Sequence, residues 1–76
     1  MEDWKALRGI AGMSQIQLAA AAGVSRFRLS LAECGQGELT EAERGSLRRT
    51  LASAMTKRAA SIRSAMTSSV MAGARG

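Results

Sequence analysis

AAAAGVSRFRLSLAECG, residues 19–35, joins an alanine-rich run through one glycine to a short segment with two arginines and a phenylalanine. Glycine reaches positive φ without steric cost, so Gly23 is a favourable turn residue. Ser25, two residues later, is a preferred helix N-cap. The stretch therefore predicts a helix that ends at the turn Ala22-Gly23-Val24, and a second helix from Ser25 to about Cys34.

The residues around this turn match the packing needs of a helix-turn-helix. Its two helices cross at a steep angle over a tight turn. A small residue is needed where the helices touch, and Ala19 lies four positions before the glycine. Apolar side chains must also face the shared core from both helices, and the candidates are Leu18, Ala22, Val24, Leu29 and Ala32. The pattern indicates two helices that share one core.

The rest of the chain also favours helices. It has no proline and no strand-like alternation, and good helix formers such as alanine, leucine and arginine dominate. The sequence predicts an all-α fold of four to five helices. The helix before the turn is expected at 15–21, and further helices are expected at 4–11 and from 41 onward; their N-caps in chain order are Asp3 for 4–11, Ser14 for 15–21 and Thr40 for the last helix. Gln17 and Glu43 each lie three residues after a cap, which permits a capping box.

An amphipathic stripe marks the second half of the chain. Apolar residues recur at Leu47, Leu51, Met55, Ala59, Ile62, Met66 and Val70. This spacing predicts one long helix, or two helices with a bend near Thr56-Lys57. We expect a domain at 1–55, a basic amphipathic helix in 56–76, and disorder at 72–76. Because a small core cannot cover so long a stripe, we expect the C-terminal helix to form a homodimer, to bind phosphate or to fray.

Charge is unevenly distributed along the chain. The net charge is +5, and residues 1–43 carry four bases and all six acids, a balance of −2. Residues 44–76 carry seven bases and no acid, a balance of +7. Such a segment favours a polyanionic partner, because lysine and arginine release counterions from phosphates. The alternatives are a solvated basic face and a membrane-surface helix, which lacks an aromatic anchor after Phe27.

Several classes of function are disfavoured by composition. The chain has no histidine and one cysteine, Cys34, so neither an intrachain disulfide nor a Cys/His zinc site is expected. No catalytic constellation or phosphate-binding glycine loop is recognisable, so no enzyme activity, cofactor or metal is expected. No apolar run approaches the length of a membrane span, and a cytoplasmic location is expected.

Residues 13–35, MSQIQLAAAAGVSRFRLSLAECG, resemble the helix-turn-helix of the Cro/phage-repressor-like regulators, the Xre family. The matching motifs are Ser14-Gln15, Leu18-Ala19, Ala22-Gly23-Val24-Ser25 and Glu33-Cys34-Gly35. The resemblance extends over residues 4 to about 55. It implies a lambda-repressor-like domain that binds double-stranded operator DNA, usually as a dimer. It also implies a bacterial, phage or mobile-element protein associated with the nucleoid.

The resemblance also implies roles for individual side chains. Residues that would project outward from the second helix of the motif are Ser25, Arg26, Phe27, Ser30, Leu31 and Cys34. Arg26 would be the main base reader, because a guanidinium can grip guanine O6 and N7 together. Gln15 and Arg28 would bind phosphates, and the two serines could reach a phosphate or a base edge. Glu33 would be mainly structural.

The roles of Phe27 and Leu31 are left open by the sequence. The two side chains lie four residues apart, hence on one helix face, where polar readers are typical. They could contact thymine methyl groups, bind a protein, or, with the helix rotated, let Phe27 cover the following helix. The leading hypothesis is a sequence-specific transcriptional regulator, by default a repressor. The alternative is a protein-interaction module on the same fold, antitoxin-like or an accessory adaptor.

Overall fold

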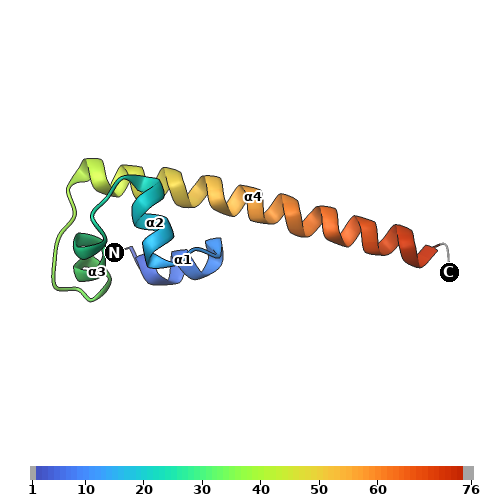
Figure 1. Cartoon of the computed structure of the whole chain (residues 1–76), viewed down its shortest axis with the longest axis horizontal. Coiled ribbons are helices and arrows are strands. Elements are labelled where there is room, and N and C mark those ends of the chain that lie inside the picture. Colours follow the sequence, from blue (N-terminus) through green and yellow to red (C-terminus); the bar gives the residue numbers. More distant parts are fainter. Residues whose placement is uncertain (1, 75–76) are drawn as a thin grey trace.

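The computed structural model describes the backbone of residues 2–74 and the side chains of residues 2–67. Within residues 2–74 it contains helices and no strands, which confirms the all-α prediction (Figure 1). The helices are α1 (Trp4–Ala11), α2 (Gln15–Ala22), α3 (Arg26–Glu33) and α4 (Glu41–Ala74). The count is thus four within this part of the chain. No helix there has the length and apolarity needed to cross a bilayer.

The short helices gather against the N-terminal half of α4, and its other half extends away from them (Figure 1). The chain measures 54 × 21 × 19 Å. We call residues 2–58 the body and residues 59–74 the arm. This division follows from contacts, because among the side chains described, up to residue 67, the guanidinium of Arg58 is the last in α4 that bonds to another helix, at the carbonyl oxygen of Gly9.

The predicted caps are present at the helix starts. The side chains of Asp3, Ser14, Ser25 and Thr40 each accept a hydrogen bond from a backbone N–H three residues later. Gln17 and Glu43 complete capping boxes by accepting from the N–H of Ser14 and Thr40. Gly23 ends α2 with φ of +70°, as the turn prediction required. Local sequence therefore determines where these helices begin and end.

The core lies where the short helices meet α4. Leu18, Leu29 and Leu47 are fully buried, and Ala19 belongs to the same core cluster with 3% exposure. The remaining buried apolar residues are Trp4, Ala11, Val24, Leu39 and Leu51. Ala22 and Ala32 pack against this cluster while partly exposed. The core residues predicted around the turn thus all contribute to it.

The long amphipathic segment forms one helix, so no bend divides it near Thr56-Lys57. The boundary expected at residue 55 falls inside this helix. The stripe is buried at Leu47 and Leu51 but exposed at Ile62 and Met66, by 51% and 64%. Of the expected disordered end, residues 75–76 lie outside the described residues, whereas α4 runs to Ala74. The side chains of Val70 and Met71 also lie outside the described part.

Candidate nucleic-acid interface

An ion pair anchors the C-terminal end of α3 to α1. Arg8 donates from Nε and Nη2 to the carboxylate of Glu33 at 2.7 and 2.9 Å, and the two side chains are only 15% and 5% exposed. Arg8 also donates to the carbonyl oxygen of Met13. The guanidinium of Arg8 holds the pKa of Glu33 below its ordinary value of 4.5, an effect that outweighs burial. Glu33 therefore occupies the structural position expected for it.

A second ion pair anchors α3 to the start of α4. Arg28 donates from Nε and Nη2 to Glu43 at 2.8 and 2.7 Å, and it also donates to the carbonyl oxygen of Glu38. The bond from Arg28, followed by the bond from the Thr40 N–H, lowers the pKa of Glu43 to about 2. Arg28, the expected phosphate ligand, thus has its charge already compensated inside the protein.

Gln15 links the N-terminus of α2 to both ends of α3. Its Oε1 accepts a hydrogen bond from Arg26 Nε, and its Nε2 donates to Glu33, both at 3.3 Å. The sequence-predicted pair Gln15 and Arg26 is therefore brought together. Arg26 is exposed and has no carboxylate partner among the ion pairs of the described residues. Its guanidinium is a positive group at the surface of α3.

The exposed face of α3 carries an aromatic ring in its first turn. Phe27 is 71% exposed, and Ser25 and Cys34, which flank α3 at its two ends, are also exposed, while Ser30 is partly buried. The rotated arrangement in which Phe27 covers the following helix is therefore not observed. The physical reason is that Leu29 fills the core and directs Phe27, two residues earlier, toward solvent.

Leu31 was expected to project outward, but its side chain is less exposed than that expectation requires. It is partly buried by the loop after α3, and its carbonyl oxygen accepts a hydrogen bond from the Gln36 N–H. A Cβ at Gly37 would lie 2.9 Å from the Leu31 Cβ, so the glycine allows the loop to pass close to this side chain. The candidate interface is therefore centred on Arg26 and Phe27, with Leu31 at its margin.

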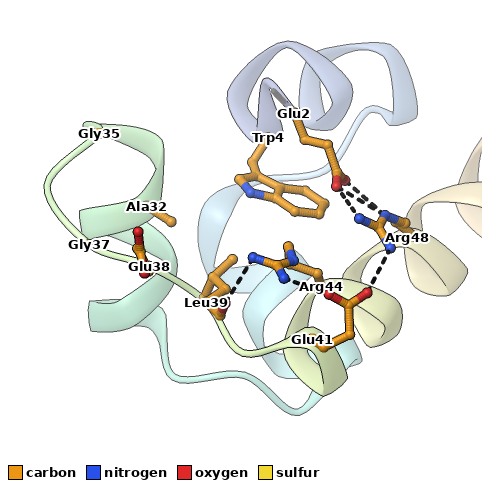
Figure 2. Close-up of a pocket in the computed structure, with 10 residues that line it drawn as sticks. All are labelled: Glu2, Trp4, Ala32, Gly35, Gly37, Glu38, Leu39, Glu41, Arg44 and Arg48. Carbon is orange, nitrogen blue, oxygen red and sulfur yellow. Dashed lines mark hydrogen bonds and ion pairs between the residues drawn. The ribbon is translucent and has the colours of Figure 1, made fainter.

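A shallow pocket lies on a different part of the body, beside α1 and the loop before α4 (Figure 2). Its volume is about 580 Å³, and the Trp4 ring, Leu39, Arg44 and Arg48 are among its lining. The arginines that line it are already in ion pairs, so the pocket offers no uncompensated cation. No cluster of acidic or cysteine side chains suited to a metal occurs within the described part of the chain.

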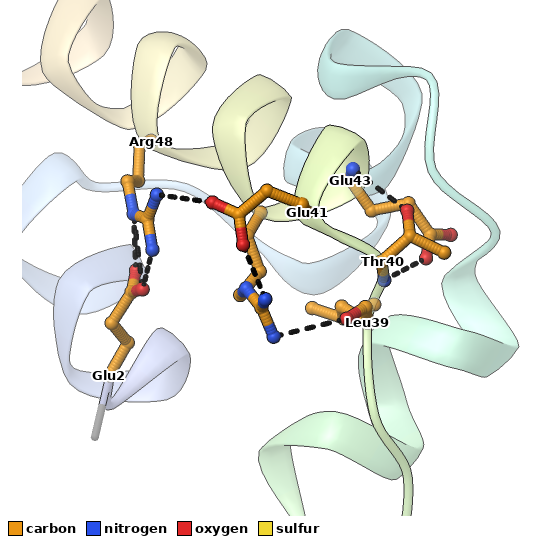
Figure 3. A network of polar contacts seen from close by, with 7 residues as sticks. Glu2, Leu39, Thr40, Glu41, Glu43 and Arg48 are labelled. Carbon is orange, nitrogen blue, oxygen red and sulfur yellow. Dashed lines mark hydrogen bonds and ion pairs between the residues drawn. The ribbon is translucent and has the colours of Figure 1, made fainter.

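Ion pairs compensate much of the positive charge at the start of α4. Arg48 pairs with Glu2 and, at 3.7 Å, with Glu41, which also pairs with Arg44 at 2.5 Å (Figure 3). Beyond these contacts, Lys57, Arg58 and Arg63 follow with no acid after Glu43. Within the described residues of α4, the bases without a carboxylate partner are therefore Arg49, Lys57, Arg58 and Arg63, of which only Arg63 lies on the arm.

Sequence reasoning missed both ion pairs that anchor α3. Their partners are separated by 25 and 15 residues, distances at which helical periodicity carries no signal. For Glu43 the sequence predicts only a capping box with Thr40, and that role and the bond to Arg28 coexist on the same carboxylate.

Comparisons with known proteins gave no relative: no protein-family model matches the chain, and neither a curated protein nor a solved structure does.

Proposed function

We propose that the protein binds double-stranded DNA sequence-specifically and regulates transcription, as a repressor that occludes its operator. In this proposal α2 and α3 form a helix-turn-helix of the lambda-repressor-like type, and α3 enters the major groove. Two copies read two half-sites. The protein acts without catalysis, inside a bacterial cell, on chromosomal, phage or mobile-element DNA.

The observation that carries the proposal is the way α3 is held. Ion pairs fasten it from two sides, through Glu33 to α1 and through Arg28 to α4, and Leu29 is fully buried beneath it. The opposite face, with Arg26 and Phe27, remains exposed. A base-reading surface needs such preorganisation, because side chains placed on a rigid element lose less entropy when they bind.

Each side chain then has a distinct role. Arg26, oriented by Gln15, reads a guanine through O6 and N7, and Phe27 packs on a thymine methyl group. Ser25 and Ser30 reach phosphate or base edges. The N-terminus of α2, with the amide of Gln15, binds a backbone phosphate, since helix N-termini attract anions. Arg28 contributes to phosphate binding only by exchanging Glu43 for a phosphate.

A second candidate, a protein-interaction module, is favoured by one specific observation. The exposed face of α3 includes the aromatic ring of Phe27, and exposed aromatic residues are typical anchors of protein interfaces. The compensated charge of Arg28 also reduces the positive potential next to this face. An antitoxin-like or adaptor role would use the same surface without reading DNA.

The test is selection of bound sequences from a random double-stranded DNA pool at two salt concentrations. The proposal expects an enriched motif with guanine in each half-site, and an affinity that falls steeply with salt. Arg26→Ala should lose the guanine preference, whereas Arg63→Ala, a matched loss of one charge on the arm, should weaken binding while preserving the motif. Retention of DNA by the protein without enrichment of any sequence motif would contradict sequence-specific binding. Phe27 would then be interpreted as an anchor for a protein partner.

A further inference from the structure

A chain of hydrogen bonds connects the ion pair between α1 and α3 to the exposed Arg26. Its inner end is formed by Arg8 and Glu33, whose side chains are 15% and 5% exposed. Glu33 Oε1 accepts from Arg8 Nη2 at 2.9 Å and from Gln15 Nε2 at 3.3 Å. Gln15 Oε1 in turn accepts from Arg26 Nε at 3.3 Å. We call these four residues the polar chain, because they link the interior to the side chain assigned to base reading.

The two neighbours of Gln15 in the polar chain fix the direction of its side-chain amide. A carboxylate only accepts hydrogen bonds, and a guanidinium only donates them. The NH2 group of Gln15 must therefore face Glu33, and its carbonyl oxygen must face Arg26. A reversed amide would place its oxygen against the Glu33 carboxylate and its NH2 group against the Arg26 Nε–H. Glu33, as the buried neighbour, thus holds the amide in the direction that presents an acceptor to Arg26.

The number of nitrogen atoms already engaged distinguishes Arg26 from the two other arginines that contact α3 or belong to it. Arg8 donates from all three guanidinium nitrogens, to Glu33 and to the carbonyl oxygen of Met13. Arg28 donates once from Nε and twice from Nη2. Among the hydrogen bonds of the described residues, Arg26 donates only from Nε. Both terminal nitrogens of Arg26 therefore remain for a ligand.

The engaged nitrogen determines how Arg26 can approach a base. A guanidinium can meet guanine O6 and N7 either with its two terminal nitrogens or with Nε and one terminal nitrogen. The bond from Nε to Gln15 occupies the second of these edges. The edge formed by Nη1 and Nη2 carries two N–H groups side by side, which match the two guanine acceptors. Because the side chain is held before DNA binds, less conformational entropy is lost on binding.

We propose that Glu33 is a positioning residue for base reading, which acts through Gln15 so that Arg26 reads guanine with its two terminal nitrogens. This role rests on the proposed function and adds a specificity determinant that does not itself touch DNA. The bond from Arg8, with a smaller contribution from the bond of Gln15, lowers the pKa of Glu33 below its ordinary 4.5. The carboxylate is therefore ionised at neutral pH and serves only as an acceptor, as the polar chain requires.

NMR of the free protein tests the polar chain without DNA. The Nε–H of Arg26 should exchange with water more slowly than the Nε–H of the exposed Arg63, because it is hydrogen-bonded. Gln15→Met removes the acceptor and should abolish this difference. The double variant Arg8→Met/Glu33→Met should also abolish it, although both residues act on Arg26 only through Gln15. Replacing both partners leaves no unpaired buried charge, so the fold should be retained.

Base discrimination on the selected DNA motif tests the consequence for recognition. Gln15→Met and the double variant Arg8→Met/Glu33→Met should each reduce the preference for guanine by about two- to twelve-fold, the effect of one hydrogen bond. The three substitutions together should reduce it no further, because both changes act through the same amide. Glu38→Gln, at an exposed glutamate, is the control and should leave the preference unchanged. The readout is a ratio of affinities, which a loss of folding or of phosphate contacts does not alter.

The two measurements separate failure of the polar chain from failure of the proposed function. Exchange of the Arg26 Nε–H as fast as that of Arg63 in the unmodified chain would overturn the inference. A guanine preference that survives in Arg8→Met/Glu33→Met would also overturn it and leave Glu33 with a structural role alone. Slow exchange in a chain that selects no DNA motif would refute the proposed function and the base-reading role with it, while the hold on Arg26 would stand. Additive losses in the combined variant would contradict action through Gln15.

Discussion

The helix α3 and the arm of α4 are both exposed helical segments with arginines, yet they are held in opposite ways. Two ion pairs and the fully buried Leu29 bind α3 to its neighbours. The arm after Arg58 makes no side-chain hydrogen bond to another helix within the described residues. The exposed face of α3 is therefore held in place by its neighbours, whereas the exposed face of the arm, with Ile62 and Met66, belongs to a segment without such anchors.

The largest expected difference between these regions is in stability. Leu51→Ala should lower the free energy of unfolding by about 2–5 kcal/mol, because it leaves a cavity beneath a residue that is 3% exposed. Ile62→Ala, the same kind of truncation on the same helix, should change it by less than about 0.5 kcal/mol in the monomer. Thermal or urea unfolding at low protein concentration measures both. Equal effects would contradict the division into body and arm.

Removing the charge that anchors the end of α3 should have the next largest effect. Glu33→Gln leaves the guanidinium of Arg8 without a carboxylate in a partly buried site, at a cost of about 1–3 kcal/mol. Urea unfolding near neutral pH checks the value. Glu38→Gln, at an exposed glutamate of the following loop, is the matched control and should be nearly neutral. A nearly neutral Glu33→Gln would mean that the ion pair does not hold α3.

The same carboxylate should make stability depend on acid pH. The pKa of Glu33 is lower in the folded protein than its ordinary 4.5, so the unfolded chain binds a proton more readily. The stability from this group is therefore present above pH 4.5 and is lost as pH falls toward the folded value. Unfolding followed between neutral and acid pH should show a smaller loss for Glu33→Gln than for the unmodified chain.

Arg26→Ala should spare the fold and damage recognition. Arg26 is exposed, so the unfolding free energy should change by less than about 0.5 kcal/mol. Affinity for the selected DNA motif should fall by about 1–3 kcal/mol, with the loss confined to one base pair in each half-site. Binding titrations on the selected sequence and on its guanine-substituted variants measure this. A uniform loss on all sequences would assign Arg26 to a phosphate.

Phe27→Ala gives the smallest and most discriminating effect. The ring is 71% exposed, so thermal stability should be nearly unchanged. If the ring packs on a thymine methyl group, affinity falls slightly and the thymine preference at one position is lost. If DNA binding is unaffected in both respects, the ring belongs to a protein interface and the second candidate function gains support.

Helix boundaries are the part of the fold that the sequence predicted well. Asp3, Ser14, Ser25 and Thr40 are short polar side chains that bond the backbone three residues ahead, an interaction that needs no partner from elsewhere. The turn at Gly23 and the burial of Leu18 and Leu29 also followed from spacing. Such features depend on neighbours within one or two helical turns, so they can be read along the chain.

Spacing along the chain could not predict which of the candidate site residues are exposed and free of ion pairs. Arg26 and Arg28 are two positions apart with the same side chain, and only the second has its charge compensated, by a carboxylate 15 residues away. Leu31 matched an outward position but is partly covered by the loop that passes Gly37. Likewise, the apolar stripe on α4 predicted an amphipathic helix, but it did not show at which residue the short helices stop covering that stripe.

The amino-acid order was sufficient to specify an all-α chain, its caps, its turn and the apolar face of each helix, because those properties arise from interactions between residues close in sequence. Which arginines remain uncompensated, where α3 is anchored and how far the body covers α4 depend on side chains brought together from distant segments. Their contacts arise from packing three short helices on one long helix, and the same packing leaves the apolar residues Ile62 and Met66 of the arm exposed.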